Sequence, residues 1–387
     1  MRNAKLKIVA DRDLPFVHAY FAEEGELFVK PGRAIERADL LDADVLLVRS
    51  LTRVDERLLG GTPVKFVGTV TSGIDHLDTA WLDQAGIRWQ AAAGYNAQPV
   101  AEYVIAVIAA LQLQNSLPLQ ALRVGVVGVG QVGSRVAAFC EALGFEVLLC
   151  DPPRAEQEPQ FSSQALSTLA ALDLVTVHTP LTIEGLHPTY HLIHSSFLDS
   201  LSGKHVLLNT SRGAVVDFAA LSRERSHWTY CFDVWEPEPE IDLACLKAAR
   251  IATPHLAGYS VQCRYRGIAA IHQACREQGL MNAAEPSLPS LPRLRLDFGG
   301  KKLGWRDVVL AIFNPETVTQ VMKTSLLKKN DLLKGTEKCA TLFDTLRQCY
   351  IGDAIQRHEF AYTTVSKLNL EEKDRCALTK LGITIEE

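Results

Sequence analysis

The chain has 387 residues, and two or three domains are expected, because a single hydrophobic core rarely extends beyond about 250–300 residues. Its composition, 47% hydrophobic and 22% charged, is ordinary for a soluble globular protein. A net charge of −5 without a block of basic residues argues against nucleic acid as a partner. There is no signal-peptide core or membrane-length apolar run, and the nine cysteines are scattered without a CxxC pair, which together predict a cytoplasmic protein with reduced thiols.

Short apolar runs alternate with helical patterns from the start of the chain. The runs KLKIVA, ADVLLVRS, VKFVGTVTSG and IRWQAAAG are typical of strands, and helical spacing separates them. We therefore expect a first α/β unit over residues 1–95. A long apolar helix is predicted next, over NAQPVAEYVIAVIAALQLQ, with Asn96 as its N-cap.

The segment from Val124 to Asp151 is the most informative part of the sequence. It contains an apolar run ending in Gly128, then Gly130, Gly133, a helical pattern, a second apolar run and an acidic residue. This order predicts the βαβ unit that binds dinucleotides. Gly128 would permit the tight turn, Gly130 would let the backbone approach a pyrophosphate, and Gly133 would let the helix pack on the strand.

The start of this helix and the acidic residue predict which dinucleotide binds. The first helical N–H groups, with Gln131 and Val132 the nearest, would face the phosphate charge. Asp151 would accept hydrogen bonds from the adenosine ribose, and its charge would repel a 2′-phosphate. We therefore predict NAD rather than NADP, although Arg154, three residues later, could accommodate that phosphate.

A second series of strands follows the glycine-rich turn, in RVGVVG, EVLLCD, DLVTVHTP, KHVLLNTS, WTYCFDVW and RIATPH. Such near-continuous apolar runs are typical of a parallel sheet that is covered on both faces, so a doubly wound fold is expected. A helix over residues 260–280 should then pack back on the first unit. The proline-rich segment EPSLPSLPR predicts a linker before a last region of different composition.

Three motifs end strands of this second series. NTSRGAVVD carries Arg212, FDVWEPEP carries Asp233 and Glu238, and TPHLAGYS carries His255. Ligands bind at the carboxyl ends of parallel strands, so these residues should converge beside the cofactor. His255 suits proton transfer during hydride transfer, Glu238 would orient its ring, and Arg212 could hold a carboxylate. Taken singly, residues of these types in such positions are more often structural or solvated, but their order downstream of the glycine-rich turn favours the catalytic interpretation.

Two other clusters suggest sites but have simpler explanations. His187, His191 and His194 have the spacing of metal ligands on a helix, yet Pro188 interrupts that helix, so no metal site is predicted. The carboxylates of the GIDHLD segment lie where a strand gives way to a helix, and helix capping is the better interpretation.

The Arg, Glu and His motifs together resemble those of the D-2-hydroxyacid dehydrogenases, over roughly residues 5–280. The resemblance implies NAD as cofactor and a catalytic set of Arg212, Glu238 and His255. It further implies cofactor contacts from Asp151, Thr179, Asp233 and Gly258, and substrate contacts from Ser50, Thr71 and Tyr259. Arg49 is added as a phosphate contact on charge grounds alone.

The segments PGRAI, VRSLTRVDERLL, CDPPR and HLAGYS narrow the resemblance to a branch that oxidises a four-carbon 2-hydroxyacid with a terminal phosphate. The expected fold is α/β, with a flavodoxin-like substrate lobe (residues 1–95 and 258–284), a Rossmann-like NAD-binding domain (96–257) and a smaller α+β C-terminal domain (285–387) that forms a homodimer. Another phosphorylated hydroxyacid such as 3-phosphoglycerate, or an NAD-sensing binding protein on the same fold, remains an alternative.

Overall fold

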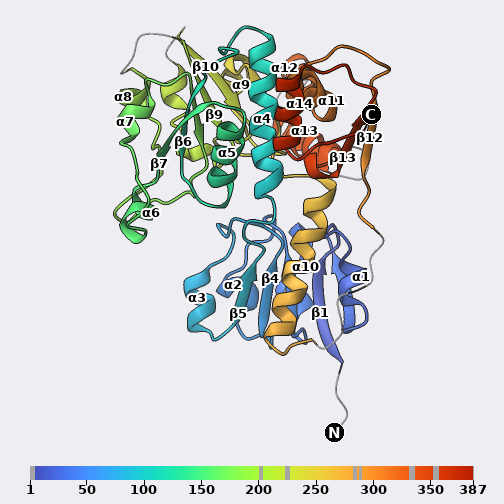
Figure 1. Ribbon diagram of the computed structural model, residues 1–387. Coiled ribbons are helices and arrows are strands. Elements are labelled where there is room, and N and C mark those ends of the chain that lie inside the picture. Colours follow the sequence, from blue (N-terminus) through green and yellow to red (C-terminus); the bar gives the residue numbers. More distant parts are fainter. Residues whose placement is uncertain are drawn as a thin grey trace. The chain divides into compact units, whose positions relative to one another are not determined.

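A computed structural model describes residues 5–199, 204–222, 227–281, 286, 290–330, 336–351 and 357–386. The chain divides into two compact units (Figure 1). Unit 1 consists of Met1–Asn96 and Val261–Leu291, and unit 2 consists of Ala97–Ser260 and Pro292–Glu387. Each unit is an α/β structure built on parallel strands, which confirms the predicted fold class.

Unit 1 contains a five-stranded parallel sheet in the order β2-β1-β3-β4-β5, the flavodoxin-like order. Its strands are β1 (Leu6–Asp11), β2 (Gly25–Lys30), β3 (Val45–Val48), β4 (Phe66–Thr69) and β5 (Arg88–Ala91). Its helices are α1 (Val17–Phe21), α2 (Glu56–Leu59), α3 (Thr79–Gln84) and α10 (Val261–Glu277), with 3₁₀ turns η1 (Gly32–Ala34) and η2 (Arg37–Leu40).

Helix α10 completes the core of unit 1 although it lies far along the chain. Ile268, Ile271 and Cys275 of α10 are buried in one cluster with Ile8 and Leu47 of the sheet. This confirms the prediction that the helix after residue 260 packs on the first unit. Strand β2 was not predicted; it lies at the edge of the sheet, and its short apolar run Leu27–Val29 is largely exposed.

Unit 2 contains a six-stranded parallel sheet in the order β11-β10-β9-β8-β6-β7, so the strand order reverses between β6 and β8. Its strands are β6 (Arg123–Val127), β7 (Glu146–Cys150), β8 (Leu174–Val177), β9 (His205–Asn209), β10 (Trp228–Phe232) and β11 (Ile251–Ala252). Around it lie α4 (Ala97–Leu113), α5 (Gln131–Ala142), α6 (Pro152–Gln157), α7 (Leu166–Leu169), α8 (Ser195–Leu198) and α9 (Leu243–Ala248), with η3 (Gly213–Val215) and η4 (Ala219–Ser222).

In the last part of unit 2, the described residues form four helices and a three-stranded parallel sheet, β12-β13-β14. Its elements are β12 (Leu294–Asp297), α11 (Trp305–Ile312), α12 (Pro315–Asn330), α13 (Thr336–Ile351), η5 (Phe360–Tyr362), β13 (Thr363–Ser366), α14 (Glu372–Lys380) and β14 (Thr384–Ile385). Helix α4 lies between α5 and these C-terminal helices (Figure 1), and Trp305 and Val308 share its buried cluster. Met322 and Phe343 join the cluster that covers the other strands.

The compact units differ from the predicted boundaries, which placed Asn96 in the NAD-binding domain and residues 285–291 in the C-terminal domain, whereas both belong to unit 1. Residues 258–260 belong to unit 2, where Ser260 donates a hydrogen bond to the buried Glu359 carboxylate at 2.5 Å. The C-terminal region shares its core with the six-stranded sheet, and both lie in one unit. The predicted start of a separate C-terminal domain, at residue 285, lies outside the described residues, and that domain stays a prediction.

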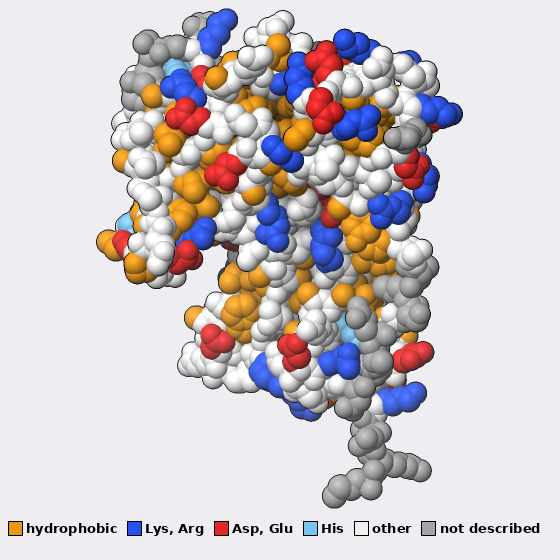
Figure 2. Space-filling model, in the orientation of Figure 1, with side chains coloured by type: hydrophobic (Ala, Val, Ile, Leu, Met, Phe, Trp, Pro, Cys, Tyr) orange, Lys and Arg blue, Asp and Glu red, His pale blue; other side chains and the backbone are white. Residues whose placement is uncertain are grey.

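The surface of the molecule carries mixed charge. On the face seen in Figure 2, Lys and Arg side chains are interspersed with Asp and Glu, in agreement with the near balance of 40 basic and 45 acidic residues. Among the described residues, no helix combines the length and the apolar character that crossing a membrane requires.

Candidate active site

The glycine-rich turn has the geometry that the sequence predicted. Gly128 has a φ of +83°, which favours glycine, and a Cβ on Gly133 would lie 2.0 Å from the Gly128 carbonyl oxygen. A Cβ on Gly130, by contrast, would meet nothing within 4 Å. Helix α5 begins at Gln131, so its first N–H groups lack partners within the helix. The turn therefore offers open space and free backbone donors at a helix N-terminus, which suits a pyrophosphate.

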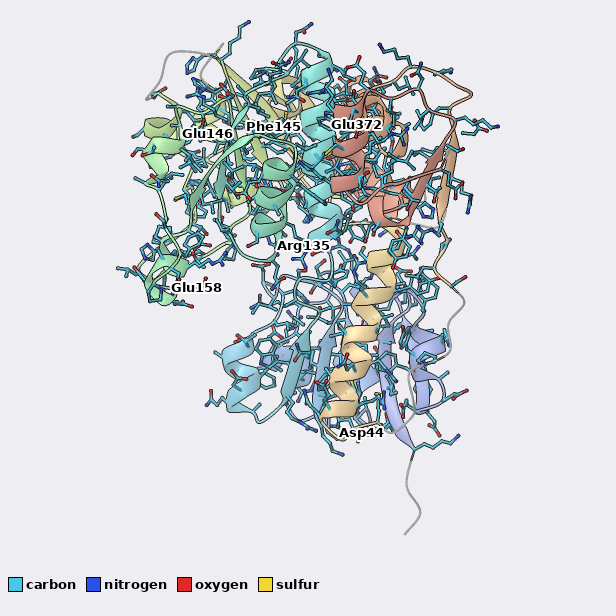
Figure 3. The ribbon with its side chains drawn as sticks, viewed as in Figure 1. Asp44, Arg135, Phe145, Glu146, Glu158 and Glu372 are labelled. Carbon is cyan, nitrogen blue, oxygen red and sulfur yellow. The ribbon has the colours of Figure 1, made fainter. Side chains whose placement is uncertain are left out.

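Asp151 lies directly after β7, beside this turn. Its Oδ2 accepts the Val129 N–H at 2.7 Å, and its Oδ1 caps α6 by accepting the Arg154 N–H at 3.1 Å. The Arg154 guanidinium donates to the Glu158 carboxylate at 2.9 Å and to the Val129 carbonyl at 2.8 Å. Glu158 is labelled in Figure 3, near the end of α6. Much of the Arg154 charge is therefore already compensated, and the carboxylate of Asp151 remains the dominant charge at this position.

We expect catalytic efficiency with NAD to exceed that with NADP by at least about tenfold, a modest 1.4 kcal/mol for two like charges. The Asp151→Asn variant keeps one oxygen for the helix cap but loses the negative charge and the second acceptor, so it should narrow this ratio. Steady-state kcat/KM with each cofactor, for wild type and variant, measures both effects. Equal efficiencies with the two cofactors in the wild-type enzyme would contradict the assignment of Asp151.

Thr179 lies just after the carboxyl end of β8, next to the point where the strand order reverses. Its Oγ1 is buried and has no hydrogen-bond partner in the described structure. A buried hydroxyl without a partner is unfavourable unless a ligand completes its hydrogen bonds. Thr179 also touches the turn, because a Cβ on Gly128 would lie 2.8 Å from its backbone N. The open turn and this unsatisfied hydroxyl fit a dinucleotide at the carboxyl end of the sheet.

Asp233 holds the loop that carries the histidine. Its buried carboxylate accepts hydrogen bonds from the Thr253 hydroxyl at 2.6 Å and from the backbone N–H groups of Leu256 and Ala257, both at 2.9 Å. Its carbonyl oxygen also accepts the His255 N–H at 2.7 Å. Burial raises the pKa of Asp233, although the charge of His255 and these hydrogen bonds oppose the rise. Asp233 therefore fixes the conformation of the loop around His255, whose φ is +53°.

Glu238 and His255 form the hydrogen-bonded pair that the sequence predicted. Glu238 Oε2 lies 2.7 Å from His255 Nδ1, and Glu238 Oε1 accepts the Trp235 N–H at 2.9 Å. This contact places the proton on Nδ1 and leaves Nε2 for a substrate. Burial would raise the pKa of Glu238, but the charge and hydrogen bond of His255, aided by Arg347 and the Trp235 N–H, lower it. Glu238 is therefore ionised at neutral pH.

Arg212 lies in the loop that follows β9. Its carbonyl accepts a hydrogen bond from the Asn209 side chain at 2.8 Å, and its own Nη1 donates to the Ser211 carbonyl at 2.9 Å. A Cβ on Gly213 would lie 1.9 Å from the Trp235 carbonyl oxygen. The loop that carries Arg212 therefore packs tightly, through Gly213, against the loop that leads to Glu238.

Three predicted substrate contacts, Arg49, Ser50 and Thr71, belong to unit 1. Arg49 forms ion pairs at 2.8 Å with the fully buried Asp11 and with Asp13. The Thr71 hydroxyl donates to the Gly73 carbonyl at 2.7 Å, and Ser50 is exposed. Substrate contacts from Arg49, Ser50 and Thr71 stay predictions. The same holds for the roles assigned to Gly258 and Tyr259, which lie in unit 2.

The three histidines with metal-like spacing have separate partners. His187 lies 2.8 Å from Glu156, His191 lies 3.0 Å from Glu236, and His194 caps α8. Among the described residues, no group of His, Cys, Asp and Glu could hold a metal ion.

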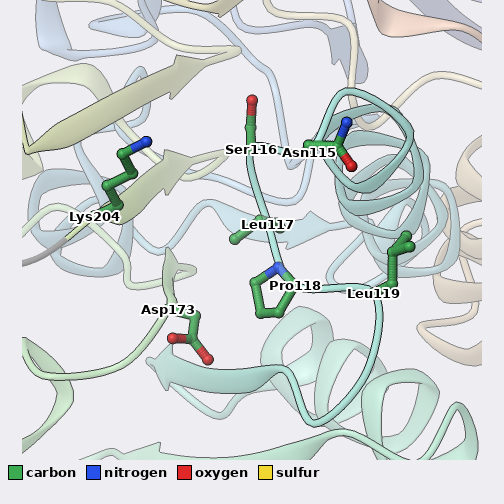
Figure 4. A pocket seen from close by; sticks show the side chains of 7 residues that line it. All are labelled: Asn115, Ser116, Leu117, Pro118, Leu119, Asp173 and Lys204. Carbon is green, nitrogen blue, oxygen red and sulfur yellow. The ribbon is translucent and has the colours of Figure 1, made fainter.

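A separate hollow of about 430 Å³ lies near the amino ends of β6, β8 and β9 in the six-stranded sheet (Figure 4). The residues that line it come before β6, β8 and β9, namely Asn115, Ser116, Leu117, Pro118, Leu119, Asp173 and Lys204. The predicted site residues of unit 2 instead follow strands of this sheet. The hollow is therefore not part of the candidate active site.

Comparison with known proteins identifies the family. Residues 107–257 match the model of the D-isomer specific 2-hydroxyacid dehydrogenase, NAD binding domain. An erythronate-4-phosphate dehydrogenase of Coxiella burnetii is 42% identical over 331 residues, covering 84% of this chain and 89% of the relative. The chain belongs to the erythronate-4-phosphate dehydrogenase family.

Another member of this family and a more distant solved structure are also similar to this chain. The erythronate-4-phosphate dehydrogenase of Azotobacter vinelandii is 42% identical over 357 residues, covering 89% of this chain and 92% of the relative. The D-lactate dehydrogenase of Aquifex aeolicus, solved with NAD and lactic acid, has a TM-score of 0.58 at 23% identity and covers 71% of this chain and 96% of its own. That likeness shows the shared fold. As a member of the erythronate-4-phosphate dehydrogenase family, the chain is an NAD-dependent 2-hydroxyacid dehydrogenase.

Sequence reasoning did not find several residues that shape the site. The Thr253 hydroxyl joins Asp233 to the buried Tyr103, whose OH lies 2.7 Å away. Arg347 of α13 donates from Nη2 to the Tyr259 OH at 3.3 Å. The TPH motif already contains Thr253, but no motif marks Tyr103 or Arg347, which are distant in sequence from the groups that they contact.

Proposed function

We propose that the chain oxidises the C2 hydroxyl of 4-phospho-D-erythronate to (R)-3-hydroxy-2-oxo-4-phosphooxybutanoate with NAD, a step in pyridoxal 5′-phosphate biosynthesis. The observation that carries the proposal is the Glu238–His255 pair, with 2.7 Å between Oε2 and Nδ1, in the same unit as the glycine-rich turn. Relatives that are 42% identical to this chain over 331 and 357 aligned residues carry the name of this activity.

Arg212, His255 and Glu238 have different roles in the proposed reaction. Arg212 binds the substrate carboxylate through paired hydrogen bonds, which hold C2 and its hydroxyl in place. His255 Nε2 accepts the hydroxyl proton while the C2 hydrogen departs as a hydride, and the C–O bond becomes a carbonyl. Glu238 stabilises the imidazolium that forms. NAD, when bound, supplies the hydride acceptor.

The cofactor would be held by the turn and by the strand ends around it. Gly128, Gly130 and Gly133 shape the turn, and the N–H groups of Gln131 and Val132 face the pyrophosphate. Asp151 binds the adenosine ribose, and Thr179 completes its hydrogen bonds with the cofactor. Asp233 and Gly258 would contact the nicotinamide end. The open space at Gly130 and the unsatisfied Thr179 hydroxyl support this assignment.

A panel of substrates tests the proposal. We expect kcat/KM for 4-phosphoerythronate to exceed that for 3-phosphoglycerate, lactate and glycerate by roughly a hundredfold, because a mismatched charged contact costs a few kcal/mol. 3-Phosphoglycerate is one carbon shorter, so its carboxylate and phosphate cannot both reach their anchors. NADH fluorescence measures all four side by side. A higher efficiency for any of the other three would overturn the substrate assignment.

We also infer that the enzyme is a cytoplasmic homodimer that binds neither nucleic acid nor membrane. The family resemblance supports a dimer formed by the C-terminal region. The mixed surface charge supports the absence of a nucleic-acid partner. Light scattering of the full chain checks the assembly, and the mass of a single chain would contradict the dimer.

A further inference from the structure

Arg347 brings a positive charge from the C-terminal region to the Glu238–His255 pair. It lies on α13, and its Nη2 donates to the Tyr259 OH at 3.3 Å, with the guanidinium carbon 5.9 Å from the centre of the Tyr259 ring. Its electrostatic partners are Tyr259, Glu238 and Asp233, so it lies in the field of the catalytic carboxylate. These groups all belong to unit 2.

The hydrogen-bonding capacity of Arg347 is largely unused. Its Nε is buried and has no hydrogen-bond partner in the described structure. Among the described residues, no carboxylate lies within ion-pair distance of its guanidinium. Burial would lower the pKa of Arg347, but the interactions with Tyr259 and with the Glu238 carboxylate raise it, so the guanidinium is cationic. A half-buried cation with an unsatisfied buried Nε is suited to an anionic ligand.

Arg49, the cation that the sequence suggested for the phosphate, differs in this respect. It is held at 2.8 Å by Asp11 and at 2.8 Å by Asp13, so two carboxylates already compensate its charge. A phosphate would have to compete with both of them. The contrast favours Arg347, whose hydrogen bonds leave room for further acceptors.

We propose that Arg347 binds the phosphate group of the substrate beside Tyr259, while Arg212 binds the carboxylate at the other end. The inference rests on the proposed function, because it requires a substrate with two anionic ends. The guanidinium offers several N–H donors in a fixed plane, which matches phosphate oxygens better than the single charge of a lysine does. Arg347 thereby selects phosphorylated substrates.

The first test compares a phosphorylated with an unphosphorylated substrate. Arg347→Met keeps most of the side-chain length but removes the charge. We expect kcat/KM for 4-phosphoerythronate to fall at least about thirtyfold, mainly through KM, whereas kcat/KM for erythronate stays within about twofold. Arg347→Lys should recover part of the loss. Arg375→Met, at an exposed position on α14, is the matched control and should change neither value.

An equal loss with both substrates would overturn the proposal, and a shifted pH profile would then assign Arg347 to the support of Glu238. A second measurement does not depend on the substrate. Calorimetric titration of the NADH-bound enzyme with inorganic phosphate should show at least tenfold weaker binding to Arg347→Met, with NADH affinity unchanged. Equal phosphate affinity, or no binding by either protein, would overturn the proposal. If wild type prefers another substrate, the proposed function fails, but this titration still decides the role of Arg347.

Discussion

Replacing His255 with alanine should lower kcat by at least about a hundredfold, since a general base typically contributes that much. The pair with Glu238 leaves His255 Nε2 as the ring nitrogen that can accept the hydroxyl proton. Affinity for NADH should stay within about twofold, because the glycine-rich turn and Asp151 belong to other loops. Steady-state kinetics and NADH fluorescence titration measure the two quantities.

His18→Ala is the matched control, because His18 is exposed on α1 of unit 1. It should leave both kcat and NADH affinity unchanged. If His255→Ala retained near-normal turnover, another group would have to accept the proton, and the assignment of the Glu238–His255 pair would be wrong.

Gly213→Ala should lower kcat/KM by about a hundredfold or more, without adding or removing any charge. The new Cβ would lie 1.9 Å from the Trp235 carbonyl oxygen and 2.1 Å from its carbon, so the two loops must separate. One loop carries Arg212, and the Trp235 N–H of the other holds Glu238. Both groups should therefore lose their positions, and overpacking of this kind costs about 1–3 kcal/mol of stability.

Thermal unfolding and kinetics together check this expectation. Gly86→Ala is the control, because Gly86 has a φ of +70° and a Cβ there would meet nothing within 4 Å. That variant should lose only about 1 kcal/mol of stability through backbone strain and should keep its activity. Full activity in Gly213→Ala would mean that these loops move apart without consequence for the chemistry.

The sequence predicted the fold best where a strand is buried on both faces. The runs that became β3 and β8 are wholly buried, so their composition alone marks them as strands. Strand β2 is an edge strand with exposed residues, and β12 of the C-terminal sheet is likewise half exposed. Such strands are set by pairing with neighbours, and a single sequence does not record which neighbour that is.

The sequence predicted those site residues that come shortly after a strand. The contact between Glu238 and His255 was expected from their motifs, and the structure contains it. Arg347 lies 88 residues from Tyr259 in the sequence and belongs to no motif, so only the packing of α13 reveals its position. The tight approach of Gly213 to Trp235 is likewise a property of the folded loops.

The division of unit 1 into two chain segments has a consequence for synthesis on the ribosome. The first segment ends at Asn96, but α10, which completes its core, begins only at Val261. The ribosome must add the intervening segment Ala97–Ser260 first, which takes on the order of ten to thirty seconds at about 5–20 residues per second. During that interval the side chains that later contact Ile268 and Ile271 remain uncovered. The nascent chain should therefore be most vulnerable to aggregation, and most in need of a chaperone, before α10 emerges.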